Sequence, residues 1–295
     1  MGLNYFIARE ILDGRRGGEL GDVVTIGRMQ QFMLRGQLDA LRGRFQLPGG
    51  PWLTQPFGAY ADGFFTAAGA RSLTAIDVSA YEGAGVVHDM NEPIAAELHC
   101  RYDVCVDGGS LEHVFRPDRA LANAMRITAV GGRLIVWTPA NNLCGHGFYQ
   151  FSPEFFFSAL REPAGFELSG VHVVECVYPA VSLVPPRRAY RVRDPRELRE
   201  RVGVQSRRPL MLLVSATKLH HVEEPFADAP RQSDYEAQWR SDTGARPGSR
   251  RSLVGVAARR VRSNRATSLV VNHALGLTQR RRYSLRNRRF FEPER

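Results

Sequence analysis

Two histidines in the middle of the chain have the neighbours and spacing expected of an active site. His113 lies in residues 102–114, which read Tyr-Asp-Val-Cys-Val-Asp-Gly-Gly-Ser-Leu-Glu-His-Val, and His146 lies between two glycines in residues 141–151. Histidine is the side chain most able to accept a proton near neutral pH. Flanking glycines free the backbone to bring the His146 ring toward a substrate. We expect His146 to act as a base or to orient an acceptor, and Tyr149 to position that acceptor; a loop histidine bonded to backbone is the alternative.

The elements around these histidines form a recognisable unit. Residues 102–106 are apolar and β-branched, which predicts a buried strand, and Asp-Gly-Gly ends it. A helix is expected over about 118–128, followed by a Gly-Gly turn and a second strand over 133–137. This is a βαβ unit, and ligands bind outside the carboxyl ends of its strands. Four residues fall at this edge: Asp107, Gly108, Glu112 and His113.

The same stretch carries a family resemblance. Residues 102–114, followed by a helix and by Val-Gly-Gly-Arg-Leu-Ile at 130–135, resemble the fourth and fifth strands of class I S-adenosylmethionine-dependent methyltransferases. Gly-His-Gly-Phe-Tyr-Gln-Phe-Ser-Pro at 145–153 is similar to a segment that one subgroup carries after strand five. The resemblance covers roughly residues 22–219. It implies a Rossmann-like α/β fold, with a seven-stranded mostly parallel sheet, an antiparallel last strand, helices on both faces, and S-adenosylmethionine as cofactor.

The resemblance makes residues 23–26 the first strand and places the methionine part of the cofactor at the loop that follows. That loop normally carries several glycines, because backbone must approach the cofactor closely. Here it reads Gly-Arg-Met-Gln, so only Gly27 is kept. The resemblance then implies that Gly27 suffices and that Arg28 or Gln30 contacts the cofactor. A site that has degenerated is the alternative.

Two further strand ends are implied to hold the nucleoside. Strand two, residues 72–76, ends at Asp77, whose carboxylate is expected to accept hydrogen bonds from both ribose hydroxyls. A helix N-cap role for Asp77 is the alternative. After strand three, Asp89 is expected to bind the adenine amino group while Met90 packs on the ring. A plain polar turn at Asp89 is the alternative.

Later segments complete the expected sheet. Residues 166–178 and 209–219 suit strands six and seven, with the last inserted antiparallel by family analogy. Residues 184–205 form an insertion between them, in which 195–201 predict a charged helix. Earlier in the chain, 4–12, 30–41 and 60–69 predict helices, and 43–59 predict a loop rich in Gly, Pro and aromatic residues.

Composition limits the class of protein. The 295 residues are 43% hydrophobic, as is ordinary for a globular protein, and no apolar run reaches the ~20 residues of a membrane span. No secretory signal is evident, so a cytoplasmic protein is expected. The four cysteines form no CxxC pair and His220-His221 has no partner at metal spacing, so no metal site is expected.

The positive charge is concentrated in the last part of the chain. The net charge is +10, and residues 231–295 hold 16 arginines against 5 acids. We therefore expect a methyltransferase-like domain over 1–230 and a basic, partly disordered extension over 231–295. The extension makes nucleic acid a possible partner, although its few aromatic residues argue against stacking on bases.

Together these features predict methyl transfer from S-adenosylmethionine to an oxygen or nitrogen acceptor. A small molecule or a glycan is the expected acceptor. Two alternatives compete with this prediction: a binding module of the same fold that has lost catalysis, and a nucleic-acid-associated protein that acts through its basic extension.

Overall fold

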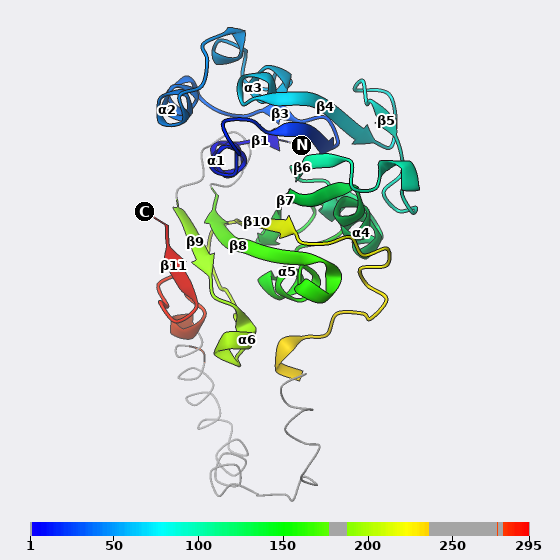
Figure 1. Cartoon of the computed structure of the whole chain (residues 1–295). Coiled ribbons are helices and arrows are strands. Elements are labelled where there is room, and N and C mark those ends of the chain that lie inside the picture. The colour runs from blue at the N-terminus through cyan, green and yellow to red at the C-terminus, as the bar shows by residue number, and fades with distance from the viewer. Residues whose placement is uncertain (1, 177–187, 236–275, 277–279, 295) are drawn as a thin grey trace, which may run out of the picture.

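The computed structural model describes residues 2–176, 188–235, 276 and 280–294 (Figure 1). A nine-stranded sheet runs through this described part of the chain. From one edge to the other it contains β11 (Phe291–Pro293), β9 (Arg188–Val192), β8 (Phe166–Glu175), β10 (Leu210–Lys218), β7 (Thr128–Asn141), β6 (Tyr102–Asp107), β2 (Gly21–Ile26), β4 (Ala70–Asp77) and β5 (Val86–Val87). A second, two-stranded sheet joins β1 (Gly2–Leu3) to β3 (Gln30–Gln31).

The strand directions agree with the expected mostly parallel, Rossmann-like sheet. The neighbours β5, β4, β2, β6 and β7 are all paired parallel. The strand β10 lies between β7 and β8 and is antiparallel to both, as expected of the last strand. The mostly parallel α/β sheet is therefore confirmed. The expected strand number of seven is wrong, because β9 and β11 extend the sheet antiparallel beyond β8.

Helices cover both faces of the sheet. Its described helices are α1 (Tyr5–Asp13), α2 (Arg35–Phe45), α3 (Asp62–Ala67), α4 (Pro117–Ile127), α5 (Pro153–Ala159) and α6 (Pro195–Leu198). On one face, Val104 and Val106 of β6 share a core with α1, α2 and α3. On the other face, Cys105 shares a core with α4 and α5. This alternation is the period of two that a strand buried on both faces requires.

Local sequence explains the elements that position the site. The side chain of Asn4 accepts hydrogen bonds from the N–H groups of Phe6 and Ile7, which caps α1. Pro117 begins α4, where its missing N–H costs nothing, and α4 agrees with the predicted helix within one residue at each end. Both elements therefore begin where capping chemistry predicts.

The helix predicted over 30–41 is shifted in the structure. Gln30 and Gln31 form β3 instead, and α2 starts only at Arg35. The reason is tertiary, because the N–H of Gln31 donates to the carbonyl of Ala59 at 2.7 Å and its carbonyl accepts from Gly58 at 2.7 Å. A long-range pairing of this kind outweighs the local helical spacing.

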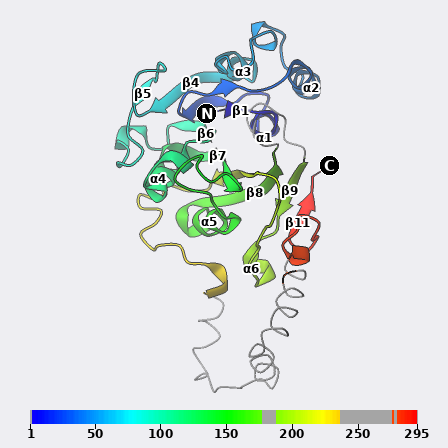
Figure 2. The same ribbon diagram turned by 180° about the vertical axis from the view of Figure 1, so that it is seen from behind.

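The end of the chain belongs to the sheet. In both views β11 lies beside β9 (Figures 1 and 2). Phe290 and Phe291 are completely buried. Residues 280–294 of the expected basic extension therefore contribute to the core, and β9 lies in what the sequence predicted to be an insertion. The predicted boundary at residue 230 stays a prediction, since 236–275 lie outside the described residues.

None of the helices described here has both the length and the apolar character needed to span a bilayer.

Candidate functional site

A cavity of about 460 Å³ opens at the carboxyl edge of the parallel strands. The ends of β2 and β4 and the segments after β5 and β6 surround it. Five of the residues predicted from sequence line it: Gly27, Asp77, Asp89, Met90 and His113. These residues are far apart in the sequence, and the sheet brings them to one cavity, as expected for the carboxyl ends of neighbouring parallel strands.

Gly27 and Asp77 form one side of this cavity. Gly27 has a φ of +72°, in the left-handed region that favours glycine, and its N–H donates to the carbonyl of Ile76 at 2.6 Å. Oδ1 of Asp77 accepts from the N–H of Val78 at 2.7 Å. An ionised carboxylate can accept several hydrogen bonds, so this one contact leaves Asp77 further capacity as an acceptor.

Asp89 and Met90 form the opposite side. Oδ1 of Asp89 accepts from the backbone N–H and the side-chain amide of Asn91, at 2.9 and 2.8 Å. These hydrogen bonds lower the pKa of Asp89, which therefore stays ionised at neutral pH. Met90 is 6% exposed and reaches from the core to the cavity wall. An acceptor and an apolar surface thus adjoin, as recognition of an aromatic amine requires.

Asp107 does not line the cavity but shapes the loop that does. It is 5% exposed, and its carboxylate accepts from the N–H groups of Gly109, Ser110 and Leu111 at 3.0, 2.7 and 3.1 Å. Burial and the nearby Glu112 carboxylate raise the pKa of Asp107 to about 7, against the opposing effect of these three bonds. The Asp107 carboxylate therefore organises this loop, and its predicted place at the ligand edge stays a prediction.

Ser110 was not predicted from sequence, although it lines the cavity. Its hydroxyl donates to the carbonyl of Ile26 at 2.7 Å, which joins the loops after β6 and β2. Its position directly after Asp-Gly-Gly, at the end of a predicted strand, is the sequence signal that indicates it.

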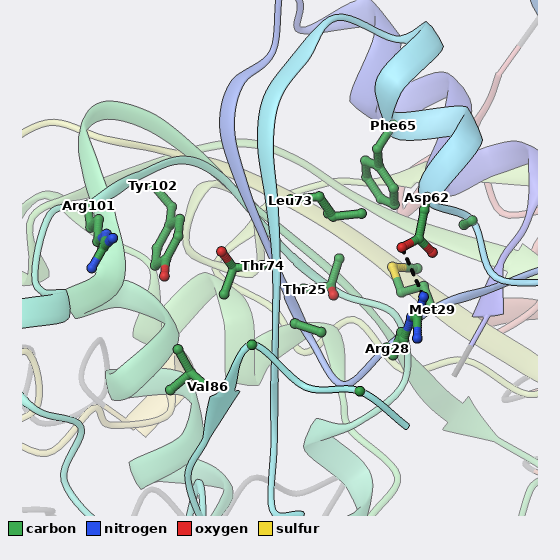
Figure 3. A pocket seen from close by; sticks show the side chains of 14 residues that line it. Thr25, Arg28, Met29, Asp62, Phe65, Leu73, Thr74, Val86, Arg101 and Tyr102 are labelled. Carbon is green, nitrogen blue, oxygen red and sulfur yellow. Dashed lines mark hydrogen bonds and ion pairs between the residues drawn. The ribbon is translucent and has the colours of Figure 1, made fainter. Parts of the chain in front are cut away.

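Gly108 and Arg28 also lie away from the cavity. A Cβ at Gly108 would come within 2.4 Å of the Met29 methyl group, so the small residue there serves close packing. Arg28 faces a second cavity of about 370 Å³ on the sheet, with Asp62 at the same end and Arg101 at the other (Figure 3). The structure therefore does not bring these two predicted residues to the others.

Three contacts hold Arg28 where it is. Its guanidinium donates to the carbonyl of Glu82 at 2.8 Å, lies 3.1 Å from a carboxylate oxygen of Asp62, and stacks 3.9 Å from the ring centroid of Tyr60. An ion pair, a hydrogen bond and a cation–π contact together fix the side chain. These contacts hold its guanidinium at the second cavity, away from the cavity at the carboxyl edge where a cofactor contact was predicted.

Glu112, His113 and His146 form a compact group beside the cavity. Glu112 is completely buried, and its Oε2 accepts from the hydroxyl of Thr138 at 2.9 Å. Nε2 of His146 lies 3.6 Å from Oε1 of Glu112, and the imidazole centroids of His113 and His146 are 5.2 Å apart. The interaction with the Glu112 carboxylate raises the pKa of His146. The two predicted histidines are thus brought together, with a buried carboxylate behind them.

Tyr149 is close to this group but its hydroxyl is engaged. It donates to the carbonyl of Phe115 at 2.9 Å, while the backbone N–H of Tyr149 lies 3.3 Å from the carbonyl oxygen of Glu112. The predicted acceptor-positioning hydroxyl thus contacts backbone in this conformation. Its ring still lies between Phe148 and Phe151, at centroid distances of 6.4 and 6.0 Å.

Comparisons with known proteins give a limited result. No family model and no curated protein matches the chain. Among solved structures, it is similar to the 1,6-didemethyltoxoflavin-N1-methyltransferase of Burkholderia thailandensis, with 16% identity, a TM-score of 0.39, and coverage of 73% of this chain and 78% of that one. A TehB-like SAM-dependent methyltransferase from Corynebacterium glutamicum matches at 17% identity and a TM-score of 0.36, covering 72% of this chain and 86% of that one. Scores this low assign no activity to the chain.

Proposed function

We propose that this chain transfers a methyl group from S-adenosylmethionine to an oxygen or nitrogen acceptor. The supporting observation is the cavity at the carboxyl edge, which gathers Gly27, Asp77, Asp89 and Met90 from three separate strand ends. In doubly wound sheets this edge is where nucleotide-like ligands bind. The volume of about 460 Å³ falls in the range of small-molecule sites.

The residues at this cavity fit the cofactor chemically. Asp77 retains acceptor capacity for ribose hydroxyls, and Asp89 is an ionised acceptor suited to an exocyclic amino group. Met90 offers an apolar, polarisable surface next to Asp89, and thioethers contact aromatic rings favourably. Gly27 gives the close backbone approach that a bulkier residue would prevent. The loss of the other glycines therefore leaves a site that still matches a nucleoside.

Bound S-adenosylmethionine supplies an already activated methyl group on its sulfonium. The task of the chain is to align the acceptor with that group and to exclude water. His113 lines the cavity, so it belongs to the wall of the cofactor site. His146 does not line the cavity, but its side chain is half exposed and its ring centroid lies 5.2 Å from that of His113, so an acceptor can reach it beside the cofactor site.

His146 is the residue we propose to orient the acceptor or to take its proton, with Tyr149 nearby as the second acceptor contact. Glu112 stands behind His146 in the place of a carboxylate that orients an imidazole. A small molecule or a glycan is the proposed acceptor, since the half-exposed ring leaves an open approach. The Arg-rich segment that motivated nucleic acid as a partner lies largely outside the described residues.

The direct test is a calorimetric titration of the full-length chain with S-adenosylmethionine and, in parallel, with S-adenosylhomocysteine. We expect saturable one-to-one binding of both. Transfer of isotope-labelled methyl to a panel of small-molecule and glycan acceptors then separates an enzyme from a binding module of the same fold. If neither nucleoside bound, the proposal would be overturned.

A further inference from the structure

We propose that Glu112, His113 and His146 bind one divalent transition-metal ion at the edge of the cavity. One ligand atom from each residue can be chosen so that all three atoms lie within 4.8 Å of one another. Two imidazoles and one carboxylate form a ligand set suited to zinc and to other first-row divalent ions. Nothing in the proposed methyl transfer requires such an ion, so the site goes beyond that function.

The strongest observation is a buried carboxyl oxygen that accepts no hydrogen bond within the described residues. Oε1 of Glu112 is buried and accepts no hydrogen bond among the described residues. A buried carboxyl oxygen without a hydrogen bond costs free energy, so such an atom in a native structure is rare and often belongs to a ligand or ion site. This oxygen lies 3.6 Å from Nε2 of His146, on the side where the imidazoles lie. A cation between them would satisfy it.

The distances fit a site that tightens slightly on binding. Ligand atoms that share one ion at about 2.1 Å lie about 3.0–3.5 Å from each other. The 3.6 Å between Glu112 and His146 is already close to this spacing. Both histidine side chains are exposed, so small rotations can bring the third ligand in without disturbing the core.

A second set of contacts holds the ligands in place. The Thr138 hydroxyl donates to Oε2 of Glu112 at 2.9 Å, which leaves Oε1 for the ion. A carboxylate that binds a metal ion is usually held in place by a hydrogen bond of this kind. The N–H of Phe148 donates to the carbonyl of Glu112 at 2.8 Å, and a Cβ at Gly147 would lie 2.7 Å from the same oxygen. The loop carrying His146 is therefore packed directly against the carboxylate residue.

Three protein ligands leave open positions on the ion, as in catalytic metal sites. An acceptor oxygen bound there would be polarised and would lose its proton more readily. His146 would then be a ligand of the ion, and the ion would orient the acceptor. This last step rests on the proposed methyl transfer, whereas the cation site itself does not.

A second group of potential ligands serves as the internal control. Among the described residues, His99, His221 and Glu223 also lie within 4.8 Å of one another. Nε2 of His221 already contacts Glu223 at 3.0 Å, and Nδ1 lies 3.3 Å from the ammonium of Lys218. A neighbouring ammonium disfavours a cation, so we do not propose binding there.

The test is a titration of the full-length, chelator-treated chain with Co²⁺, followed by visible absorption and by competition with Zn²⁺. We expect one saturable equivalent per chain. His113→Ala and His146→Ala should each weaken it at least about tenfold, as should Glu112→Gln. Thr138→Val should weaken it by about tenfold through the carboxylate alone. His221→Ala, in the other cluster, should leave it unchanged.

The cation site would be overturned if the natural chain showed no saturable binding, or if binding survived both histidine variants of the site. Loss in His221→Ala alone would move the ion to the other cluster and equally refute the proposal. Both histidines are exposed, so their variants stay informative even if Glu112→Gln fails to fold. Titration with S-adenosylmethionine tests the proposed methyl transfer separately. Cobalt binding without nucleoside binding would contradict only the methyl transfer. Nucleoside binding without cobalt binding would contradict only the cation site.

Discussion

Nε2 of His172 lies 2.9 Å from Oε1 of Glu294, and this contact ties the end of the chain to the middle of β8. The guanidinium of Arg9 in α1 binds the other oxygen of the same carboxylate. Both partners of this carboxylate are largely buried, with exposed side-chain fractions of 8% for His172 and 15% for Arg9. The Glu294 carboxylate thus connects the last described residue to helix α1 and to strand β8.

Acid should weaken this connection. The hydrogen bonds from His172 and Arg9 lower the pKa of Glu294 to about 2 from its ordinary 4.5. A lowered folded-state pKa gives stability that is present above the ordinary value and is lost as pH falls toward the folded value. Between about pH 4.5 and 2, the free energy of unfolding should fall by on the order of 1–3 kcal/mol through this group, because solvent screens part of the interaction of a side chain that is 21% exposed.

Urea denaturation across this pH range checks the expectation. Glu294→Gln should lower stability at pH 6 and flatten the acid dependence. Glu292→Gln is the matched control, since its side chain is 57% exposed and lies 3.8 Å from Arg193. Parallel stability profiles for Glu294→Gln and the natural chain would show that Glu294 has no such role.

Removing the end of the chain should destabilise the whole domain. The sequence predicted a basic, partly disordered extension over 231–295, within which Phe290 and Phe291 are completely buried against β9 and its neighbours. Phe290→Ala should cost about 3–5 kcal/mol. Phe148→Ala, at a ring 66% exposed, should cost far less. Equal denaturation midpoints for the two variants would contradict the packing of Phe290.

Local patterns predicted the part of the fold that surrounds the site. Strand β6 and helix α4 were correct within one residue at each end, because a buried strand and an amphipathic helix with Pro at its start carry their own signals. Strand β10 was likewise expected over 209–219 and spans Leu210–Lys218. These elements are defined by residues close in sequence.

Strands β9 and β11 could not be predicted in the same way. Their pairing joins residues 190–192 to 291–293, and each segment alone is too short and too charged to indicate a strand. What makes them strands is the apolar contact of Phe291 and Val192 with the core, which depends on the completed sheet. Long-range pairing of this kind leaves no local pattern.

The site residues likewise divide into those that local sequence predicts and those that depend on long-range contacts. Asp77 and Asp89 were predicted because a strand end fixes where the next residue falls, and both line the cavity. Arg28 also follows a strand end, but Glu82, Asp62 and Tyr60 turn it to another cavity. The direction of a loop side chain is set by partners distant in sequence. Position was therefore predictable where orientation was not.

Lys218 illustrates a structural role that no motif indicates. Its ammonium is buried and donates to the carbonyls of Met125, Arg126 and Thr128 at 2.9, 3.1 and 2.8 Å. These carbonyls lie at the end of α4, where a cation is favourable. Burial lowers the pKa of Lys218, so the three hydrogen bonds must offset its desolvation.

Lys218→Met should therefore lower the free energy of unfolding by about 1–3 kcal/mol, since it removes one donor from each of three carbonyls. Chemical denaturation at neutral pH measures this loss. His220→Ala, two residues away at an exposed position, is the control and should change stability little. A neutral effect of Lys218→Met would mean that water replaces the ammonium.

Asp77→Ala should weaken S-adenosylmethionine binding. Loss of a charge-assisted acceptor costs about 1.5–3 kcal/mol, which is about tenfold or more in affinity. Asp62→Ala removes a carboxylate from the second cavity and should leave affinity unchanged. Calorimetric titration of the two folded variants compares them directly. Unchanged affinity in Asp77→Ala would remove Asp77 from the nucleoside site.

His146→Ala should separate acceptor chemistry from cofactor binding. The ring of His146 is half exposed and does not line the cavity, whereas His113 does, so nucleoside affinity should stay intact. Transfer of labelled methyl to an acceptor found by the panel screen should fall by about 10²-fold, the usual contribution of a positioned proton acceptor. The exposed His220→Ala is the matched control. A ring that contacts only the acceptor should affect transfer and leave nucleoside binding unchanged. Equal loss of binding and transfer would therefore place His146 in the cofactor pocket, and full activity of the variant would exclude His146 from the site.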